Sequence, residues 1–361
     1  MAETGSKFNF DNPDEDKLKE DREKKYASTT FIDLTRHGNR FGGPMEIQLR
    51  GDAEVTKFED SQDLTPRGNE NSQKFGAESY QDASLVHPRG GKEPRHWQSG
   101  KQILEGSGKF GTTKEGAARE MASPVFYEQE VLDKDGQPIT KSARIGKGMD
   151  YKSADVMKAL GAAKKLINDT LQTLVDNLSD AEQQQFRTDP EFRAKLREQA
   201  QVVGLKAALE GQDEQSKAVI KTLAENTALE LMHDVKLSRR GVKDEKIKAI
   251  AMVGSGLFAE SLFKHALVVE DTKTGQKKTG FEDVDDIGGF TKQASAFRLK
   301  LTRDNAKGDA RKLEDFGKDT VVECEFVGDP ERAKLFEGKK VYLDWDIVRQ
   351  LADKAKARFR K

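Results

Sequence analysis

The sequence of 361 residues has little cysteine and no excess of charge of either sign. Its one cysteine, Cys324, has no intrachain partner for a disulfide, which favours a reducing, cytoplasmic setting. Lysine and arginine total 62 and aspartate and glutamate total 63, so the net charge is -1. This balance argues against a general nucleic-acid-binding protein, which would carry a basic excess. No run approaches the roughly 18 apolar residues of a membrane span, and the first residues lack the apolar core of a signal peptide.

Charged side chains are nevertheless abundant, at 35% of the chain. Residues 1–27 are rich in Asp, Glu and Lys and poor in apolar side chains, so we expect a disordered, solvated tail. Residues 346–361 end in a basic stretch, which is typical of the C-terminal end of a helix, where cations favour the helix dipole. Contact with an anionic surface is the alternative for that stretch.

Strand and helix patterns alternate along the chain. Residues 29–35 read TTFIDLT, a β-branched run that predicts a buried strand, and residues 248–256 read KAIAMVGSG, which predicts a strand and a glycine-rich turn before a helix. Further strands are expected at 297–301, 321–326 and 341–345. Strands separated by helices predict an α/β fold with a mostly parallel sheet flanked by helices.

A helical region interrupts this alternation at residues 153–240. Apolar side chains recur there at three- and four-residue spacing in three stripes. Ser179 with Glu182 predicts a capping box, and Thr65 before Pro66 predicts an earlier helix start. We therefore expect an α/β domain over 28–345 with a helical insertion at 153–240, which serves as a solvated scaffold or binds a partner, followed by a C-terminal helix over 346–361.

The most informative local motif is RHGNR at residues 36–40, directly after the first predicted strand. Loops at the carboxyl ends of strands are where open α/β sheets bind ligands. The guanidinium groups of Arg36 and Arg40 match phosphate oxygens, and Gly38 lets the backbone approach a ligand. The same cations lower the pKa of an adjacent imidazole, which keeps a nitrogen of His37 available as a nucleophile. A surface strand end with incidental basic residues is the alternative interpretation.

Several blocks in the same order resemble the histidine phosphatase superfamily, which includes the cofactor-dependent phosphoglycerate mutases and the histidine acid phosphatases. RHG at 36–38 is followed by LTPRG at 64–68 with the Asn71-Ser72 and Phe75-Gly76 pairs, RHWQSG at 95–100, and AMVGSG at 251–256. Gly289-Phe290 and FRL at 297–299 are similar to the final strand region of the family. The resemblance covers residues 29–301.

The resemblance implies a mechanism. His37 would attack a phosphoryl group and become a phosphohistidine, while Arg36 and Arg95, joined by Arg40, hold the phosphoryl oxygens. A carboxyl group would protonate the leaving oxygen and then activate water, and its place in the family makes Glu128 and Glu130 the candidates, with Glu120 behind them. No metal and no cofactor are implied.

The sequence departs from the family at Ser255, where the second histidine of the family is expected. That histidine donates to the phosphoryl oxygens, and loss of one such donor costs about 10² to 10³ in rate. Ser255 and the backbone at Gly256 would still offer donors to an anion at a helix N-terminus. Of the remaining histidines, His87 and His96 could approach the site. His233, in a His-Asp pair, falls in a helical stripe and is rejected, and Arg89 is the alternative to Arg95.

Two functions remain open. The first is a phosphomonoester phosphatase, with a mutase as the less favoured variant. The second is a catalytically impaired phospho-ligand-binding or regulatory module. Both predict a phosphorylated small molecule or phosphate anion as the ligand, and neither requires a nucleic acid or a membrane.

Overall fold

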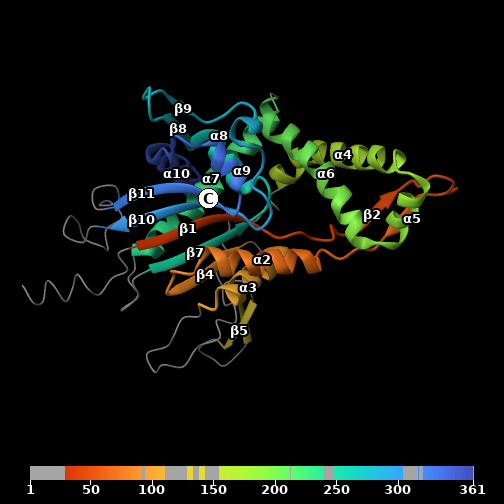
Figure 1. The fold of residues 1–361 in the computed structure, drawn as a ribbon, viewed down its shortest axis with the longest axis horizontal. Helices are drawn as coiled ribbons and strands as arrows, with labels where there is room; N and C mark the ends of the chain where they lie inside the picture. The colour runs from red at the N-terminus through yellow and green to blue at the C-terminus, as the bar shows by residue number, and fades with distance from the viewer. Residues whose placement is uncertain are drawn as a thin grey trace, which may run out of the picture.

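The computed structural model describes residues 29–90, 94–109, 128–132, 138–142, 154–211, 213–239, 247–303, 316 and 320–360. The tail predicted at 1–27 lies outside these residues. A central five-stranded sheet has the order β11-β10-β1-β7-β4 (Figure 1). Its strands are β1 (Thr29–Arg36), β4 (Leu85–Gly90), β7 (Ile247–Gly254), β10 (Ala296–Arg303) and β11 (Thr320–Val327).

The sheet is partly parallel. β7 runs parallel to both β1 and β4, whereas β10 is antiparallel to β1 and to β11. The β1–β7 register places Arg36 opposite Gly254, so the two chains leave the sheet at the same edge. The expected α/β fold, with helices flanking a central sheet, is confirmed, and the edge where β1 and β7 end is the one that carries RHGNR.

Alternating residues of β7 supply both faces of the sheet. Ala249, Ala251 and Val253 pack toward α2 (Pro66–Ser79) and α3 (Pro94–Ser107). Ile250 and Met252 pack in the larger cluster, together with buried residues of three helices. These helices are α7 (Glu214–Arg239), α8 (Phe258–Ala266) and α10 (Trp345–Arg360). Because both faces of β7 are covered, the strand is apolar from Ala249 to Val253.

A separate lobe lies beside the sheet. α4 (Ala154–Asp176), α5 (Asp180–Thr188) and α6 (Pro190–Glu210) pack with β2 (Met45–Ile47) and β3 (Thr56–Phe58) around their own cluster of buried side chains. Figure 1 shows this lobe extending to the right of the sheet. The helical region at 153–240 therefore belongs to two different packing units. α7 packs on the sheet, whereas α4–α6 pack with the β2–β3 hairpin.

Both predicted helix caps are confirmed. The Oγ1 of Thr65 accepts a hydrogen bond from the Gly68 amide at 3.0 Å. At α5, the Glu182 amide donates to Ser179 Oγ, and a Glu182 carboxylate oxygen accepts from the Ser179 amide at 2.9 Å. The capping box thus satisfies two backbone donors that the first turn of the helix leaves unpaired.

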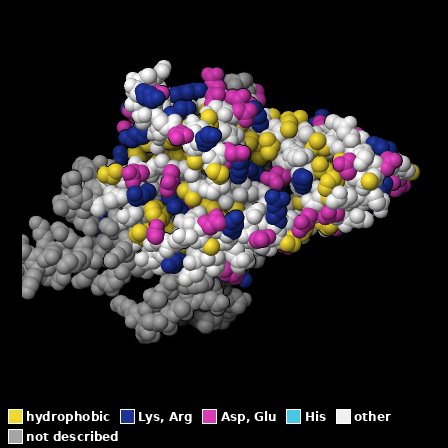
Figure 2. Space-filling view, viewed as in Figure 1, with side chains coloured by type: hydrophobic (Ala, Val, Ile, Leu, Met, Phe, Trp, Pro, Cys, Tyr) yellow, Lys and Arg dark blue, Asp and Glu magenta, His cyan; other side chains and the backbone are white. Residues whose placement is uncertain are grey.

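The remaining elements are short. They are β5 (Glu128–Leu132), β6 (Pro138–Ser142), β8 (Leu267–Asp271), β9 (Lys277–Thr279), the 3₁₀ helix η2 (Val284–Ile287), α9 (Pro330–Leu335) and β12 (Lys339–Leu343). Lys, Arg, Asp and Glu side chains are intermixed on the face seen in Figure 2, in keeping with the balanced charge of the chain. Within the described part of the chain, no helix has both the length and the apolar character that crossing a bilayer requires.

Candidate active site

The ends of β1 and β7 hold the segment that contains His37. The His37 amide donates to the Gly254 carbonyl at 3.1 Å, and the Ala294 amide donates to the Arg36 carbonyl at 3.2 Å. Ser255 follows Gly254 directly, so the position expected for the second family histidine lies next to the His37 segment. The carboxyl ends of these two parallel strands thus bring the predicted residues to one edge of the sheet.

The imidazole of His37 is buried, with 5% of the residue exposed. Its Nδ1 lies 2.6 Å from the Gly38 carbonyl oxygen. Because a carbonyl oxygen can only accept, the hydrogen bond assigns the proton to Nδ1 and leaves the lone pair on Nε2. Nε2 is therefore the nitrogen available for nucleophilic attack.

Burial lowers the pKa of His37 well below its ordinary value, and interactions with nearby titratable groups lower it further. In decreasing order of effect, these groups are Arg95, His96, Arg36 and Arg40. The electrostatic influence of all three predicted arginines therefore converges on His37. A neutral imidazole surrounded by fixed positive charge can receive a phosphate anion as a nucleophile.

Two helices hold the loop at His37–Gly38. The Gly38 amide donates to Ser99 Oγ on α3 at 2.9 Å, and that hydroxyl donates to the Arg95 carbonyl at 2.7 Å. A Cβ at Gly38 would lie 2.5 Å from the Gly68 carbonyl oxygen on α2, and a Cβ at Gly68 would lie 2.0 Å from the Asn39 carbonyl oxygen. Glycine at both positions therefore allows the loop to pack directly on the N-terminus of α2.

Arg36 is buried, and its Nη1 donates to the Thr291 carbonyl at 3.0 Å. Burial lowers the pKa of its guanidinium, while the charges of Glu198 and Glu260 oppose that shift. Within the described part of the chain, Arg36 Nε has no hydrogen-bond partner. A Cβ at Gly256 would lie 3.5 Å from Arg36 Cζ, so the AMVGSG turn lies against the guanidinium.

His96 is the histidine that the fold brings to His37. The centroids of the two rings are 5.6 Å apart, and 1% of His96 is exposed. Neither of its ring nitrogens has a hydrogen-bond partner among the described residues. Burial, followed by the charges of Arg95 and Arg40, holds the pKa of His96 well below its ordinary value. A buried polar ring without a partner is costly, which points to a group that a ligand would satisfy.

Two carboxylates at the site were missed by the sequence analysis. Glu198 on α6 accepts a hydrogen bond from Asn39 Nδ2 at 3.2 Å. Glu260 on α8 is buried, and its Oε1 accepts from the Thr291 amide at 2.5 Å, which fixes the turn that holds Arg36. No local motif marks Glu198, because its position depends on how α6 packs across the edge of the sheet.

Other residues weighed in the sequence analysis lie in different surroundings. Arg89 is buried on β4 and forms ion pairs with Glu230 and Asp234 of α7. His87, also on β4, is half-buried, and burial followed by the charges of Lys248 and Arg89 lowers its pKa to about 4. Arg89, the alternative to Arg95, therefore stabilises the β4–α7 contact.

The predicted acids Glu128 and Glu130 belong to β5, which pairs with β6. Their side chains lie outside those that the structure describes, so their catalytic role stays a prediction. Glu120 also lies outside the described residues. Within the described ranges, no three His, Cys, Asp or Glu side chains are grouped so that they could hold a metal ion.

No protein-family model matches this chain, and no curated protein is significantly similar to it. Solved structures similar to it include bacterial phytases. The Klebsiella sp ASR1 phytase has a TM-score of 0.31 and 12% identity, with coverage of 89% of this chain and 88% of the phytase. The Hafnia alvei phytase in complex with myo-inositol hexakis sulphate has a TM-score of 0.35 and 14% identity, with coverage of 92% and 87%. Its apo form has a TM-score of 0.36 and 12% identity, with coverage of 92% and 97%.

Proposed function

We propose that this protein is a phosphomonoester phosphatase that works through a phosphohistidine at His37. The observation that carries the proposal is the state of His37, which is buried, has Nδ1 bound to the Gly38 carbonyl and lies in the field of three arginines. This arrangement suits nucleophilic attack on a dianionic phosphoryl group. Similarity to phytases plays no part in the proposal, because the TM-scores are below 0.5.

In the proposed first step, Nε2 of His37 attacks phosphorus and the ester P–O bond breaks. Arg36, Arg40 and Arg95 bind the phosphoryl oxygens and stabilise the charge that develops on them in the transition state. The Ser255 hydroxyl and the Gly256 amide add neutral donors at the N-terminal side of α8. The leaving oxygen must gain a proton in this step, and the second step must remove one from water.

We assign that proton transfer to Glu198, which the hydrogen bond from Asn39 holds beside Arg36. Glu198 would protonate the leaving oxygen, then accept a proton from the water that hydrolyses the phosphohistidine. Glu128 and Glu130 stay the alternatives. Glu198→Gln should lower kcat by about 10² to 10⁴, the usual contribution of a general acid-base. If Glu130→Gln or Glu128→Gln lowered kcat by that factor while Glu198→Gln stayed fully active, the general acid-base would be a glutamate of β5 instead.

His96 supports an enzyme rather than a binding module. A neutral imidazole carries one N–H donor, and both ring nitrogens of His96 are buried without a partner among the described residues. We propose that this N–H donates to a phosphoryl oxygen in place of the histidine that Ser255 replaces. In this proposal, His96 supplies the transition-state donor that Ser255 does not.

The test is phosphate release from a panel of phosphomonoesters by the wild type and by His37→Ala. The wild type should hydrolyse an aryl phosphate, and His37→Ala should lose activity by a factor on the order of 10⁴ or more. Rapid denaturation during turnover should trap a phosphoryl group on the peptide containing His37. His87→Ala is the matched control, since His87 lies on β4. No release from any ester, together with thermal stabilisation by phosphate, would favour the phospho-ligand-binding alternative.

A further inference from the structure

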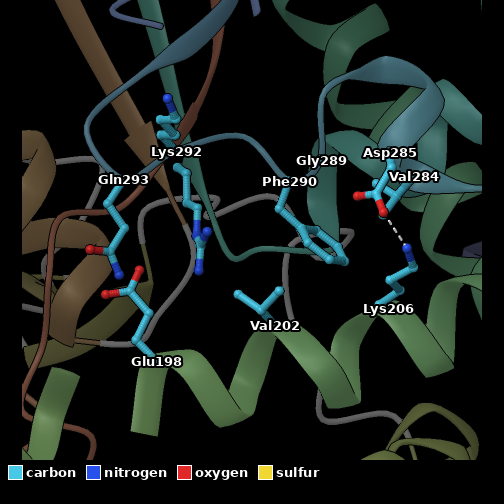
Figure 3. A pocket seen from close by; sticks show the side chains of 10 residues that line it. Glu198, Val202, Lys206, Val284, Asp285, Gly289, Phe290, Lys292 and Gln293 are labelled. Atoms are coloured by element: carbon cyan, nitrogen blue, oxygen red, sulfur yellow. Dashed lines mark hydrogen bonds and ion pairs between the residues drawn. The ribbon is translucent and has the colours of Figure 1, made fainter. Parts of the chain in front are cut away.

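We propose that the cavity beside Arg36 is the leaving-group subsite, and that it selects monoesters of small, weakly charged, partly apolar alcohols or phenols over polyphosphorylated ligands. The inference rests on the phosphatase function proposed above and names its substrate class. The cavity lies between α6 and the segment from η2 to Gln293 (Figure 3).

The cavity lies beside the proposed phosphoryl position, with which it shares Arg36. Arg36, which would hold the phosphoryl oxygens, and Glu198, which would protonate the leaving oxygen, both line it. We therefore place the alcohol part of an ester whose phosphoryl group binds Arg36 in this space.

The size of the cavity suits a small leaving group. Its volume is about 230 Å³, below the roughly 300 to 1,000 Å³ typical of pockets for drug-sized ligands. A cavity of about 150 Å³ is enough for benzene. One six-membered ring or a short branched alcohol therefore fills this subsite.

One wall of the cavity is apolar. Val202 projects from α6 between Glu198 and Lys206, and Phe290 projects toward it from the opposite segment (Figure 3). Val202 leaves 40% of its surface exposed. Covering an exposed apolar side chain with an apolar part of a ligand is favourable, because it removes apolar surface from water.

The lysines of the cavity are already neutralised. Lys206 forms ion pairs with Asp283 at 3.0 Å and with Asp285. Lys292 forms ion pairs with Asp329 at 3.0 Å and Glu331 at 2.6 Å. Additional phosphate groups on a ligand would meet Asp285 and Glu198, which line the cavity, as well as the lysines. A polyanion therefore gains little here, whereas an uncharged ring avoids the repulsion.

The experiment compares kcat/KM for phenyl phosphate and myo-inositol hexakisphosphate in the wild type, Val202→Lys and Val203→Lys. Both substitutions are at exposed positions of α6, at 40% and 45% exposure, but Val203 does not line the cavity. The wild type should prefer phenyl phosphate at least tenfold. Val202→Lys adds a cation four residues after Glu198 on α6 and so offsets carboxylate charge in the cavity. It should shift the ratio toward the hexakisphosphate tenfold or more, and Val203→Lys should leave the ratio unchanged.

The outcomes separate the subsite from the activity. Wild-type hydrolysis of the hexakisphosphate at an equal or higher kcat/KM would overturn the subsite and leave the phosphatase function standing. Equal shifts in Val202→Lys and Val203→Lys would show a general charge effect and would also overturn it. Absence of phosphate release from both esters and from the wider panel would overturn the phosphatase function, and the subsite with it.

Discussion

The buried arginines of the scaffold and of the candidate site differ in what balances their charge. Arg298 on β10 donates two hydrogen bonds to the Asp33 carboxylate, at 2.9 and 2.8 Å. Burial disfavours its charge, yet Asp33 raises the pKa of Arg298 above its ordinary value. Arg36, three residues after Asp33 on β1, instead donates to a backbone carbonyl, and burial lowers the pKa of its guanidinium.

The difference separates two uses of the same side chain. An arginine with a bidentate carboxylate is held in a fixed position and contributes to folding, because breaking the pair leaves a buried charge. An arginine with a backbone acceptor keeps most of its donors for a ligand, at a cost to the stability of the fold.

Arg298→Met should lower the free energy of unfolding by about 3 to 5 kcal/mol, because Asp33 would be left as a buried charge without its partner. Arg36→Met should leave the free energy of unfolding unchanged. It should lower kcat/KM about 10² to 10³-fold, because a hydrogen-bond donor to the phosphoryl oxygens is lost. Urea unfolding and phosphate release measure the two effects.

The double variant Asp33→Asn/Arg298→Met is the control for the first effect, since it removes both charges and should recover part of the stability. A destabilisation of Arg36→Met as large as that of Arg298→Met would contradict the distinction between scaffold and site arginines.

Phosphate or vanadate should raise the melting temperature of the wild type. An anion that binds only the folded state at 100 times its Kd stabilises it by about 2.7 kcal/mol. The shift should persist in Arg298→Lys, if that variant is folded at the starting temperature, and should be lost in Arg36→Met. Thermal scans at increasing anion concentration check this, and equal shifts in wild type and Arg36→Met would place the binding site elsewhere.

The comparison between scaffold and site also applies to histidines, whose protonation makes stability depend on pH. The pKa of His87 on the scaffold is about 4, below its ordinary value of 6.5. Between these values the unfolded chain binds more protons, so stability is complete above pH 6.5 and falls as the pH drops toward 4. Each such histidine adds a slope of up to about 1.4 kcal/mol per pH unit.

His87→Gln should reduce that slope by about one proton while leaving catalysis intact, and His96→Gln should change both the slope and kcat. Unfolding free energies at several pH values measure the slope. Parallel pH profiles for His87→Gln and the wild type would contradict the assignment for His87.

Ser255→His should have the smallest effect in the wild-type background, raising kcat less than tenfold, because His96 already supplies a donor. In a His96→Ala background the same substitution should raise kcat more strongly, since two donors that serve one oxygen are not additive. Steady-state rates of the four proteins check this. Equal gains in both backgrounds would contradict the role of His96.

Much of this arrangement is predictable from local sequence. The β-branched run before RHGNR and the apolar run before Gly254 predict β1 and β7, and parallel pairing then brings both ends to one edge. The caps at Thr65 and Ser179 depend only on residues close in the sequence, and both are confirmed.

Glu198 and the cavity were not predictable in this way. Glu198 lies about 160 positions from Asn39 in the chain, and its contact with Asn39 depends on the angle at which α6 leaves its lobe. The packing of two lobes is a long-range property that no helical stripe encodes. The division of residues 153–240 between the lobe and the sheet has the same origin, because periodicity shows that a helix has an apolar face and not which surface covers it.

The hydrogen bond between His37 Nδ1 and the Gly38 carbonyl has a consequence for the chemistry of the proposed intermediate. A phosphoryl group on His37 would be attached to Nε2, which gives a single positional isomer of phosphohistidine. Phosphoramidates of this kind hydrolyse readily in acid and persist in alkali. Alkaline quenching would therefore preserve the phosphoryl group on His37, which acidic work-up would remove. Isomer-selective detection would then show which ring nitrogen carries the phosphoryl group.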